Sequence, residues 1–384
     1  MHDVLVKGGT VIDPAQGIHE AKDVAIHQGK IEAIESSVSE ASAKRVVDAS
    51  GLIVTPGLVD LHTHTALDVS RLSIDPVRAC LFRGSTTVVD AGSTGELIFQ
   101  PFKKLVLETC RTRVLAFLNI ESLGMIADSP PEDQKWIELL TAVNELFAPL
   151  FINLENTTKV IRDNPERIVG IKWAHHGIKG LSLARTAADA AGCRIMVENH
   201  LMPEALNYLR RGDIITHAYL DIKGYGGLME GGNMMQEVHD LSRRGIILDV
   251  GHGRGSFSWK VAEMAINAGI TPDTISTDLW VANVNGPVFD MPTTMSKFLH
   301  LGMSLEDVIR ASTTTPAEVL GRLAEFGSLR IGSSADVVAM KIQEGTFPLF
   351  DANDVGRSAS RILTPVHVIR GGEVVLSNSS PLGT

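Results

Sequence analysis

Two patterns of hydrophobic and polar positions divide the chain. At both ends, short β-branched segments are separated by Gly, Asp-Pro and other turn residues, which predicts strands. These segments are Val4–Val6, Thr10–Ile12, Asp23–Ile26, Ile31–Ile34, Val46–Asp48 and Leu52–Val54, and then Asp336–Met340, Val366–Ile369 and Val374–Leu376. We therefore expect the two ends, 1–54 and 326–384, to pair into one small β-sandwich domain, with the middle of the chain inserted as a second domain.

In the middle, 55–325, apolar runs of strand length alternate with segments of helical periodicity. The strand runs are Leu58–His62, Ser85–Asp90, Val114–Asn119, Val169–Lys172, Ile195–Glu198, Ile214–Thr216, Ile246–Val250 and Thr274–Thr277. The helical patterns are Leu97–Cys110, Ser182–Ala191, Asn233–Arg244 and Ser258–Ala268. Eight strand–helix units predict an α/β fold, a (β/α)8 TIM barrel. An open doubly wound sheet is the alternative, which is disfavoured because no Gly-x-Gly-x-x-Gly follows the first strand.

Composition narrows the classes of function. The chain has 35 Lys and Arg against 45 Asp and Glu, a net charge of −10, which argues against a nucleic-acid partner. Its three cysteines are widely spaced, so a disulfide framework is excluded. A signal-peptide pattern and an apolar run of membrane-spanning length are both absent from the sequence. We expect a cytoplasmic protein with a small-molecule substrate and no membrane partner; assembly into a homo-oligomer is left open.

The first predicted barrel strand ends in His62-Thr63-His64, at the carboxyl end where a barrel keeps its active site. Side chains two apart on a strand share a face, so His62 and His64 should point into the barrel mouth and Leu61 toward the outer layer. Two converging imidazoles suit a divalent cation such as zinc. Two surface histidines after a strand are the alternative.

Other predicted strands end in residues suited to the same chemistry. Lys172 ends the fourth strand, where a dry pocket would let its neutral amine add carbon dioxide and become a metal-bridging carbamate; a lysine extending to solvent is the alternative. His200 and His217 follow the fifth and sixth strands, and either alone is typical of a loop. Asp278 ends the eighth strand, either as a helix N-cap or as a metal-bound general base.

The seventh strand runs into the glycine-rich segment Asp249–Phe257. It lacks the Lys-Ser/Thr that completes a phosphate-binding P-loop. We expect instead a close approach of the backbone to a ligand, with His252 reaching in.

Taken together, these strand ends resemble the amidohydrolase superfamily of metal-dependent hydrolases. The likeness extends to Thr55–His64, Thr315–Ala317 and Gly327–Asp336. The segments Asp249–Gly253 and Ser276–Leu279 are most similar to the branch of amidohydrolase/deacetylase metallohydrolases, near the dihydroorotases and hydantoinases. The two-ended β-sandwich is likewise a trait of this family.

The resemblance implies a role for each residue. His62, His64 and Asp278 would bind one metal ion, and carboxylated Lys172 would bridge to a second ion held by His200 and His217. A hydroxide between the two ions, zinc by default, would attack a carbonyl or ester carbon. Asp278 would act as general base and then general acid, and His252 would contact the substrate.

One departure from the family pattern concerns the fifth strand. The family places a histidine directly after the apolar run, but this position is Glu198, and His200 comes two residues later on the same face. The two residues lie ~6.6 Å apart along a strand, so they are not expected to share one coordination position. The sequence favours His200 as the ligand and leaves Glu198 open. His175 and His176 are further candidates for the site.

The sequence thus predicts a binuclear metallohydrolase that cleaves an amide or ester of a small acid, of the deacetylase type. A cyclic amidase of the dihydroorotase or hydantoinase type is the alternative, because it would share every ligand. A deaminase is less favoured, because a carboxylated lysine bridge is typical of the binuclear hydrolases. A non-catalytic scaffold that has lost its metals is a further alternative, and the intact ligand set argues against it.

Overall fold

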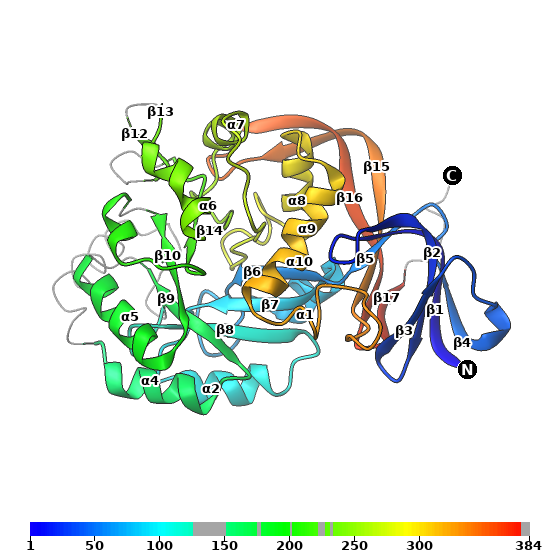
Figure 1. The fold of residues 1–384 in the computed structure, drawn as a ribbon, viewed down its shortest axis with the longest axis horizontal. Coiled ribbons are helices and arrows are strands. Elements are labelled where there is room, and N and C mark those ends of the chain that lie inside the picture. Colours follow the sequence, from blue (N-terminus) through cyan, green and yellow to red (C-terminus); the bar gives the residue numbers. More distant parts are fainter. Residues whose placement is uncertain (126–150, 175–177, 200–201, 222–226, 231–232, 378–384) are drawn as a thin grey trace.

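The structure is a computed structural model that describes residues 1–125, 151–174, 178–199, 202–221, 227–230 and 233–377. Two large sheets form its frame. Figure 1 shows the helix-surrounded parallel sheet of the middle of the chain beside the sheet built from both chain ends. A separate two-stranded sheet is formed by the antiparallel strands β12 (Met229–Glu230) and β13 (Asn233–Met234). Within the described part of the chain, no helix is long and apolar enough to cross a membrane.

The middle sheet is parallel, in the order β14-β11-β10-β9-β8-β7-β6. Its strands are β6 (Leu58–Thr63), β7 (Ser85–Ala91), β8 (Arg113–Asn119), β9 (Ile168–Trp173), β10 (Arg194–Glu198), β11 (Ile214–Thr216) and β14 (Ile247–Leu248). An eighth segment joins its two edges, because Thr274 bridges to Asp249 and Leu279 bridges to Thr63. The sheet therefore curls into a closed parallel barrel, and all eight predicted strand runs take part in it.

Helices connect the barrel strands. Between the barrel strands lie α1 (Pro76–Ala79), α2 (Phe99–Phe102), α4 (Leu154–Asp163), α5 (Ile178–Ala191), α6 (Leu241–Arg244) and α7 (Trp259–Asn267), with the short turns η2 (Leu81–Arg83), η6 (Glu204–Asn207) and η7 (Gln236–Asp240). After the eighth segment come α8 (Met291–His300), α9 (Leu305–Ser312) and α10 (Thr314–Val319), and the short turn η1 (Glu40–Ser42) lies in the end sheet. Two of the helices expected from the sequence differ in the structure. The first continues from α2 as the π-helix η3 (Lys103–Leu107), and the helix expected over 233–244 begins as β13, because Asn233 and Met234 pair with β12.

The prediction that Leu61 points to the outer layer of the barrel, which came from simple alternation along the strand, was wrong. Leu61 packs with Val89, Phe117 and Met196 in a buried cluster of barrel residues, although His62 also reaches across the barrel to Thr216. The register between β6 and β7 shifts between Asp60 and Thr63, which lets neighbouring residues turn to one side. The irregularity therefore brings His62 into the barrel without removing Leu61 from its core.

Both chain ends contribute to one connected eight-stranded sheet, in the order β17-β16-β15-β5-β1-β2-β3 with β4 paired to β1. Its strands are β1 (His2–Asp13), β2 (Ile18–His27), β3 (Lys30–Glu35), β4 (Ala43–Asp48), β5 (Ile53–Pro56), β15 (Val337–Phe350), β16 (Gly356–Arg370) and β17 (Glu373–Ser377). The pairing of β5 with β15 joins the ends, as expected. The sandwich of two stacked sheets and the domain boundaries stay predictions.

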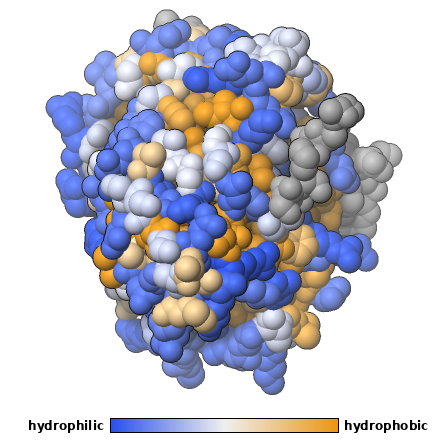
Figure 2. All heavy atoms as spheres, turned by 90° about the vertical axis from the view of Figure 1, so that its right-hand side faces the viewer, coloured by the Kyte–Doolittle hydropathy of each residue, from blue (hydrophilic) through white to orange (hydrophobic). Residues whose placement is uncertain are grey.

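Figure 2 views the molecule from the side of the end sheet. Hydrophilic residues cover most of this face, and hydrophobic residues form patches between them.

The two expected segments Val4–Val6 and Thr10–Ile12 are one strand, β1, whose register with β2 shifts between Val6 and Gly9. The Gly8-Gly9 pair is therefore an irregularity within a strand and not the turn that its composition predicts.

An ion pair with a buried carboxylate links the end sheet to the barrel. Arg113, the first residue of β8, places Nη1 2.5 Å from Oδ2 of Asp336, just before β15. The other carboxylate oxygen of Asp336 accepts hydrogen bonds from Ser334 and from the backbone N–H of Gly371. The guanidinium of Arg113 also lies over the ring of Phe326, 4.6 Å from its centroid. These contacts join β8, β15 and the β16–β17 turn at one buried carboxylate.

We expect Asp336→Asn to lower the free energy of unfolding by about 3 kcal/mol, because it removes the buried carboxylate and leaves the partly buried Arg113 without its counter-charge. Urea denaturation followed by circular dichroism measures this change. Glu373→Gln is the matched control, since Glu373 pairs with Arg111 in an exposed contact between β17 and the barrel and should change stability little. Equal effects of the two substitutions would contradict the role given to Asp336.

Candidate metal centre

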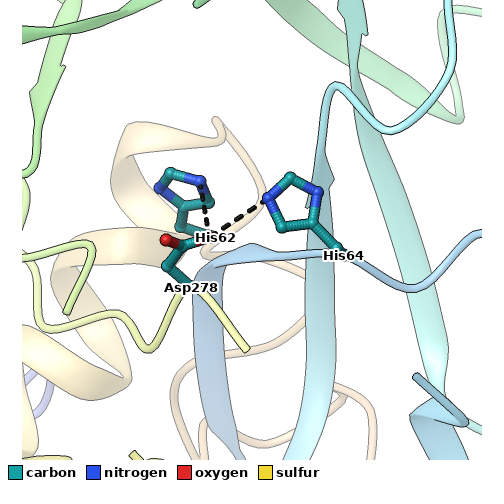
Figure 3. Close-up of side chains that lie close together, drawn as sticks. All are labelled: His62, His64 and Asp278. Carbon is teal, nitrogen blue, oxygen red and sulfur yellow. Dashed lines mark ion pairs between the residues drawn. The ribbon is translucent and has the colours of Figure 1, made fainter. Parts of the chain in front are cut away.

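Three predicted ligands converge at the carboxyl ends of the barrel strands. Nε2 of His64 lies 3.1 Å and Nε2 of His62 lies 3.3 Å from the same oxygen, Oδ1 of Asp278. Figure 3 shows both imidazoles directed at this carboxylate. One donor atom from each residue lies within 4.8 Å of the others, and all three side chains are buried. The structure thus brings together the set predicted for the first metal ion.

The chemistry of this cluster fits a cation. Oδ1 of Asp278 is buried and has no hydrogen-bond partner among the described residues. Burial, together with the charge of Lys172, holds the pKa of His62 well below its usual value, so its imidazole is neutral. A neutral imidazole and a carboxylate that face each other without a hydrogen bond are two electron-pair donors held together at a cost. Two nitrogens and one carboxylate oxygen are a usual zinc ligand set.

Asp278 and His217 share an uncommon backbone conformation. Their φ angles are 50° and 59°, in the left-handed region that residues other than glycine seldom adopt. In each case an asparagine side chain holds the carbonyl group: Asn283 donates to the oxygen of Asp278 at 2.7 Å, and Asn199 donates to the oxygen of His217 at 2.5 Å. Strain of this kind is typical of functional sites, where surrounding contacts maintain it.

Lys172 lies beside this cluster, at the end of β9, and is fully buried. Its Nζ is 3.3 Å from Nε2 of His62 and 3.8 Å from Oε1 of Glu198. Burial lowers the pKa of Lys172, against the opposing charges of Glu198 and Asp278. The amine is therefore easier to deprotonate than a lysine in water, and it does not extend to solvent.

His217, directly after β11, forms the opposite side of the site. Its Nδ1 is 2.7 Å from the carbonyl oxygen of Gly251, and its Nε2 is 3.7 Å from Oε1 of Glu198. Burial opposes its charged form, but the hydrogen bond to Glu198 and the charges of Asp278 and Glu198 outweigh burial and raise the pKa of His217. Glu198 thus lies between Lys172 and His217, in the position that the sequence leaves open.

Of the other predicted site residues, the structure describes His252 but not the remaining histidines. His200, His175 and His176 lie outside the described residues. His252 is fully buried: its Nε2 is 2.7 Å from Nζ of Lys297, its Nδ1 is 3.0 Å from the carbonyl oxygen of Gly253, and its ring stacks on Phe257. Its contact with substrate stays a prediction, because both ring nitrogens have partners within the protein.

Lys297 is a residue that sequence reasoning missed. It is fully buried in α8, and burial lowers its pKa to about 7. Its position among the apolar and small residues of α8, from Met291 to Leu299, was a signal that could have revealed it. Asp60, in the first-strand motif, is a second such residue. Burial raises the pKa of Asp60 to about 7, although Thr277 donates to it through both its hydroxyl and its backbone N–H.

Three comparisons with known proteins found relatives of this chain. A family model described as the amidohydrolase family matches residues 257–375. A protein of Agrobacterium fabrum named as a deacetylase is 35% identical over 362 residues, which cover 91% of this chain and 85% of the relative. Two solved structures, one titled a dihydroorotase and one titled an adenine deaminase, superpose with TM-scores of 0.86.

The dihydroorotase-titled structure is 32% identical and covers 98% of each chain. The one titled an adenine deaminase is 28% identical and covers 98% of this chain and 100% of its own. With a relative above 30% identity along nearly the whole chain, a matching family model and a barrel whose strand ends carry a cluster suited to a metal ion, this chain belongs to the amidohydrolase superfamily and is a hydrolase enzyme.

Proposed function

We propose that the protein is a metal-dependent hydrolase of the deacetylase type, which cleaves an acyl group from the nitrogen or oxygen of a small acid. The observation that carries this proposal is the buried Oδ1 of Asp278, which faces the imidazoles of His62 and His64 without a hydrogen bond. The deacetylase name of the Agrobacterium fabrum relative supports the choice of reaction.

His62, His64 and Asp278 would hold one divalent ion, and His217 with a residue of the fifth strand would hold a second. Divalent ions in such a site lower the pKa of bound water and polarise a carbonyl group. The observation that favours Glu198 as the fifth-strand residue is its Oε1, which lies 3.7 Å from Nε2 of His217. His200, which the sequence favours, is the alternative that the experiment below separates.

Asp278 is the residue proposed to move the proton. In hydrolysis, a water oxygen forms a bond to the acyl carbon and the bond from that carbon to the leaving nitrogen or oxygen breaks. The carboxylate of Asp278 takes a proton from the attacking water and passes it to the leaving group. The side chain of Asn283 and the carbonyl oxygen of His62 hold the backbone of Asp278 in place.

Lys172 is proposed to carry a carboxyl group. The lone pair of its neutral amine adds to the carbon of carbon dioxide, and one proton is lost, which leaves a carbamate with one negative charge and two oxygens. The support for this is its complete burial beside His62 and Glu198, where an ammonium would be repelled by two cations. The carbamate would supply the two ions with a shared ligand.

A cyclic amidase is the second candidate function. It is favoured by the likeness to the dihydroorotase-titled structure, which extends over 98% of both chains. Assays of the metal-loaded enzyme with N-acetyl amino acids, O-acetyl hydroxy acids and cyclic imides separate the two. Release of acetate supports the deacetylase proposal, whereas ring opening alone would replace it.

We expect the wild-type protein to bind about two divalent ions per chain and Lys172→Ala to bind about one, because the shared ligand is lost while His62, His64 and Asp278 remain. Elemental analysis after growth with zinc measures both numbers. A short carboxylic acid should partly restore activity to Lys172→Ala by supplying two oxygens. Absence of metal from the wild-type protein, or a bare amine at Lys172 in a fully metallated crystal, would contradict the proposal.

Asp278→Asn should lower kcat by about 10²–10⁴-fold, the usual contribution of general acid–base catalysis, and retain at least one ion. The amide keeps the shape of the side chain but cannot accept the proton. Steady-state kinetics on the substrate found above, with metal content measured on the same sample, test this. Near-normal turnover by the variant would exclude Asp278 as the proton carrier.

Glu198→Gln should lose the second ion and most activity, because an amide is a much weaker ligand than a carboxylate beside Lys172 and His217. His200→Ala is the matched comparison and should be milder. Metal content and kcat are measured for both. The reverse order of effects would assign the ligand to His200, as the sequence favours.

A further inference from the structure

Asp249 lies outside the predicted ligand set but at the centre of a buried hydrogen-bond network. It follows β14 and is fully buried. Its Oδ1 accepts a hydrogen bond from the hydroxyl of Thr274 at 2.6 Å, and its Oδ2 accepts from the hydroxyls of Thr216 at 2.8 Å and Ser276 at 2.7 Å. Burial raises the pKa of Asp249, and these three hydrogen bonds oppose that rise. Three hydroxyl protons are therefore directed at one carboxylate.

The first branch of this network ends at His62. The oxygen of the Thr216 hydroxyl is 2.8 Å from Nδ1 of His62. A hydroxyl has a single proton, and Thr216 donates it to Asp249, so its oxygen is left to accept. Nδ1 of His62 must then carry the hydrogen, and Nε2 keeps the lone pair that points toward Asp278. The carboxylate of Asp249 thus selects the tautomer that a metal ligand requires.

The second branch ends at His217. The hydroxyl of Ser276 donates to Asp249 and accepts from the backbone N–H of Gly251 at 2.9 Å. The carbonyl oxygen of Gly251 accepts from Nδ1 of His217, which leaves Nε2 facing Glu198. A side chain at position 251 would collide with the hydroxyl of Thr216 and approach Nδ1 of His217. Only glycine therefore fits between these two residues.

We propose that Asp249 is a positioning residue for both metal sites: through Thr216 and through Ser276 with Gly251, it fixes the ring orientation and tautomer of His62 and His217. This inference rests on the proposed metal-dependent function. A positioning role can be told apart from a packing role, because the three hydroxyls that donate to Asp249 are not equivalent. Thr216 and Ser276 are connected by further hydrogen bonds to His62 and His217, whereas Thr274 is connected to neither.

The third hydroxyl supplies the control. Thr274 donates to the same carboxylate, and among the described residues its hydroxyl contacts Asp249 alone. Thr216→Val and Thr274→Val therefore remove the same group from the same acceptor, and only the first also removes the partner of His62. The metal-free proteins are titrated with Zn²⁺ in competition with a chromophoric chelator, and their unfolding temperatures are recorded.

We expect Thr216→Val to weaken binding of one Zn²⁺ by about 10–100-fold, the usual effect of losing a residue that orients a metal ligand, with Thr274→Val close to wild type. Thr216→Ser, which keeps the hydroxyl, should restore the affinity. The visible spectrum of the Co²⁺-loaded protein should change in Thr216→Val and not in Thr274→Val. Equal affinities and spectra of the two valine variants would overturn the proposal, even if both unfold at lower temperature.

The wild-type protein provides a second test that needs no variant to fold. In metal-free protein with ¹⁵N-labelled histidine, we expect NMR to show His62 with its hydrogen on Nδ1, and a hydrogen on Nε2 would overturn the inference. The two failures are distinguishable. Wild-type protein that binds no Zn²⁺ contradicts the metal-dependent function, whereas tight wild-type binding without a difference between the valine variants contradicts only the role of Asp249.

Discussion

The site depends on the convergence of electron-pair donors among buried side chains at the carboxyl ends of the barrel strands. The carboxylate of Asp278 faces two imidazoles across little more than 3 Å, and its Oδ1 has no hydrogen-bond donor within the described part of the chain. Such an arrangement costs free energy in a protein without a bound cation and becomes favourable when a cation lies between the donors. The divalent ion proposed for this site would relieve that cost on binding.

Holding these donors in place requires support from the backbone. His217 and Asp278 both follow strands and both turn into the left-handed region, where the amide of an asparagine binds each carbonyl group. This turn lets a residue beyond the end of a strand direct its side chain back over the barrel. The strain is maintained because the barrel strands on either side are packed and closed.

The end sheet supports the same region from outside. Its long hairpin of β15 and β16 extends toward α7 and α8, as Figure 1 shows. Asp351, at the tip of the hairpin, accepts from the backbone N–H of Trp259 at the start of α7, and Leu363 donates to the hydroxyl of Ser296 in α8. Because α8 also carries Lys297, which binds His252, the hairpin fixes the helices that pack behind the seventh strand end. A sheet built from both chain ends thus contacts two helices that lie beside the barrel.

The convergence of His62, His64 and Asp278 was implied by the resemblance to the amidohydrolase superfamily. The sequence by itself determined the order and number of the barrel strands and the pairing of the two chain ends. These follow from local signals, because apolar runs of strand length and polar residues at their ends are visible without any long-range contact. The tertiary structure alone decided which way side chains point where the register is irregular, as at Leu61 and His62. It also decided the place of Glu198 between Lys172 and His217, the burial of Lys297 against His252, and the link from Asp249 through Thr216 to His62. Such contacts join strands and helices distant in sequence, so no periodicity or spacing along the chain records them.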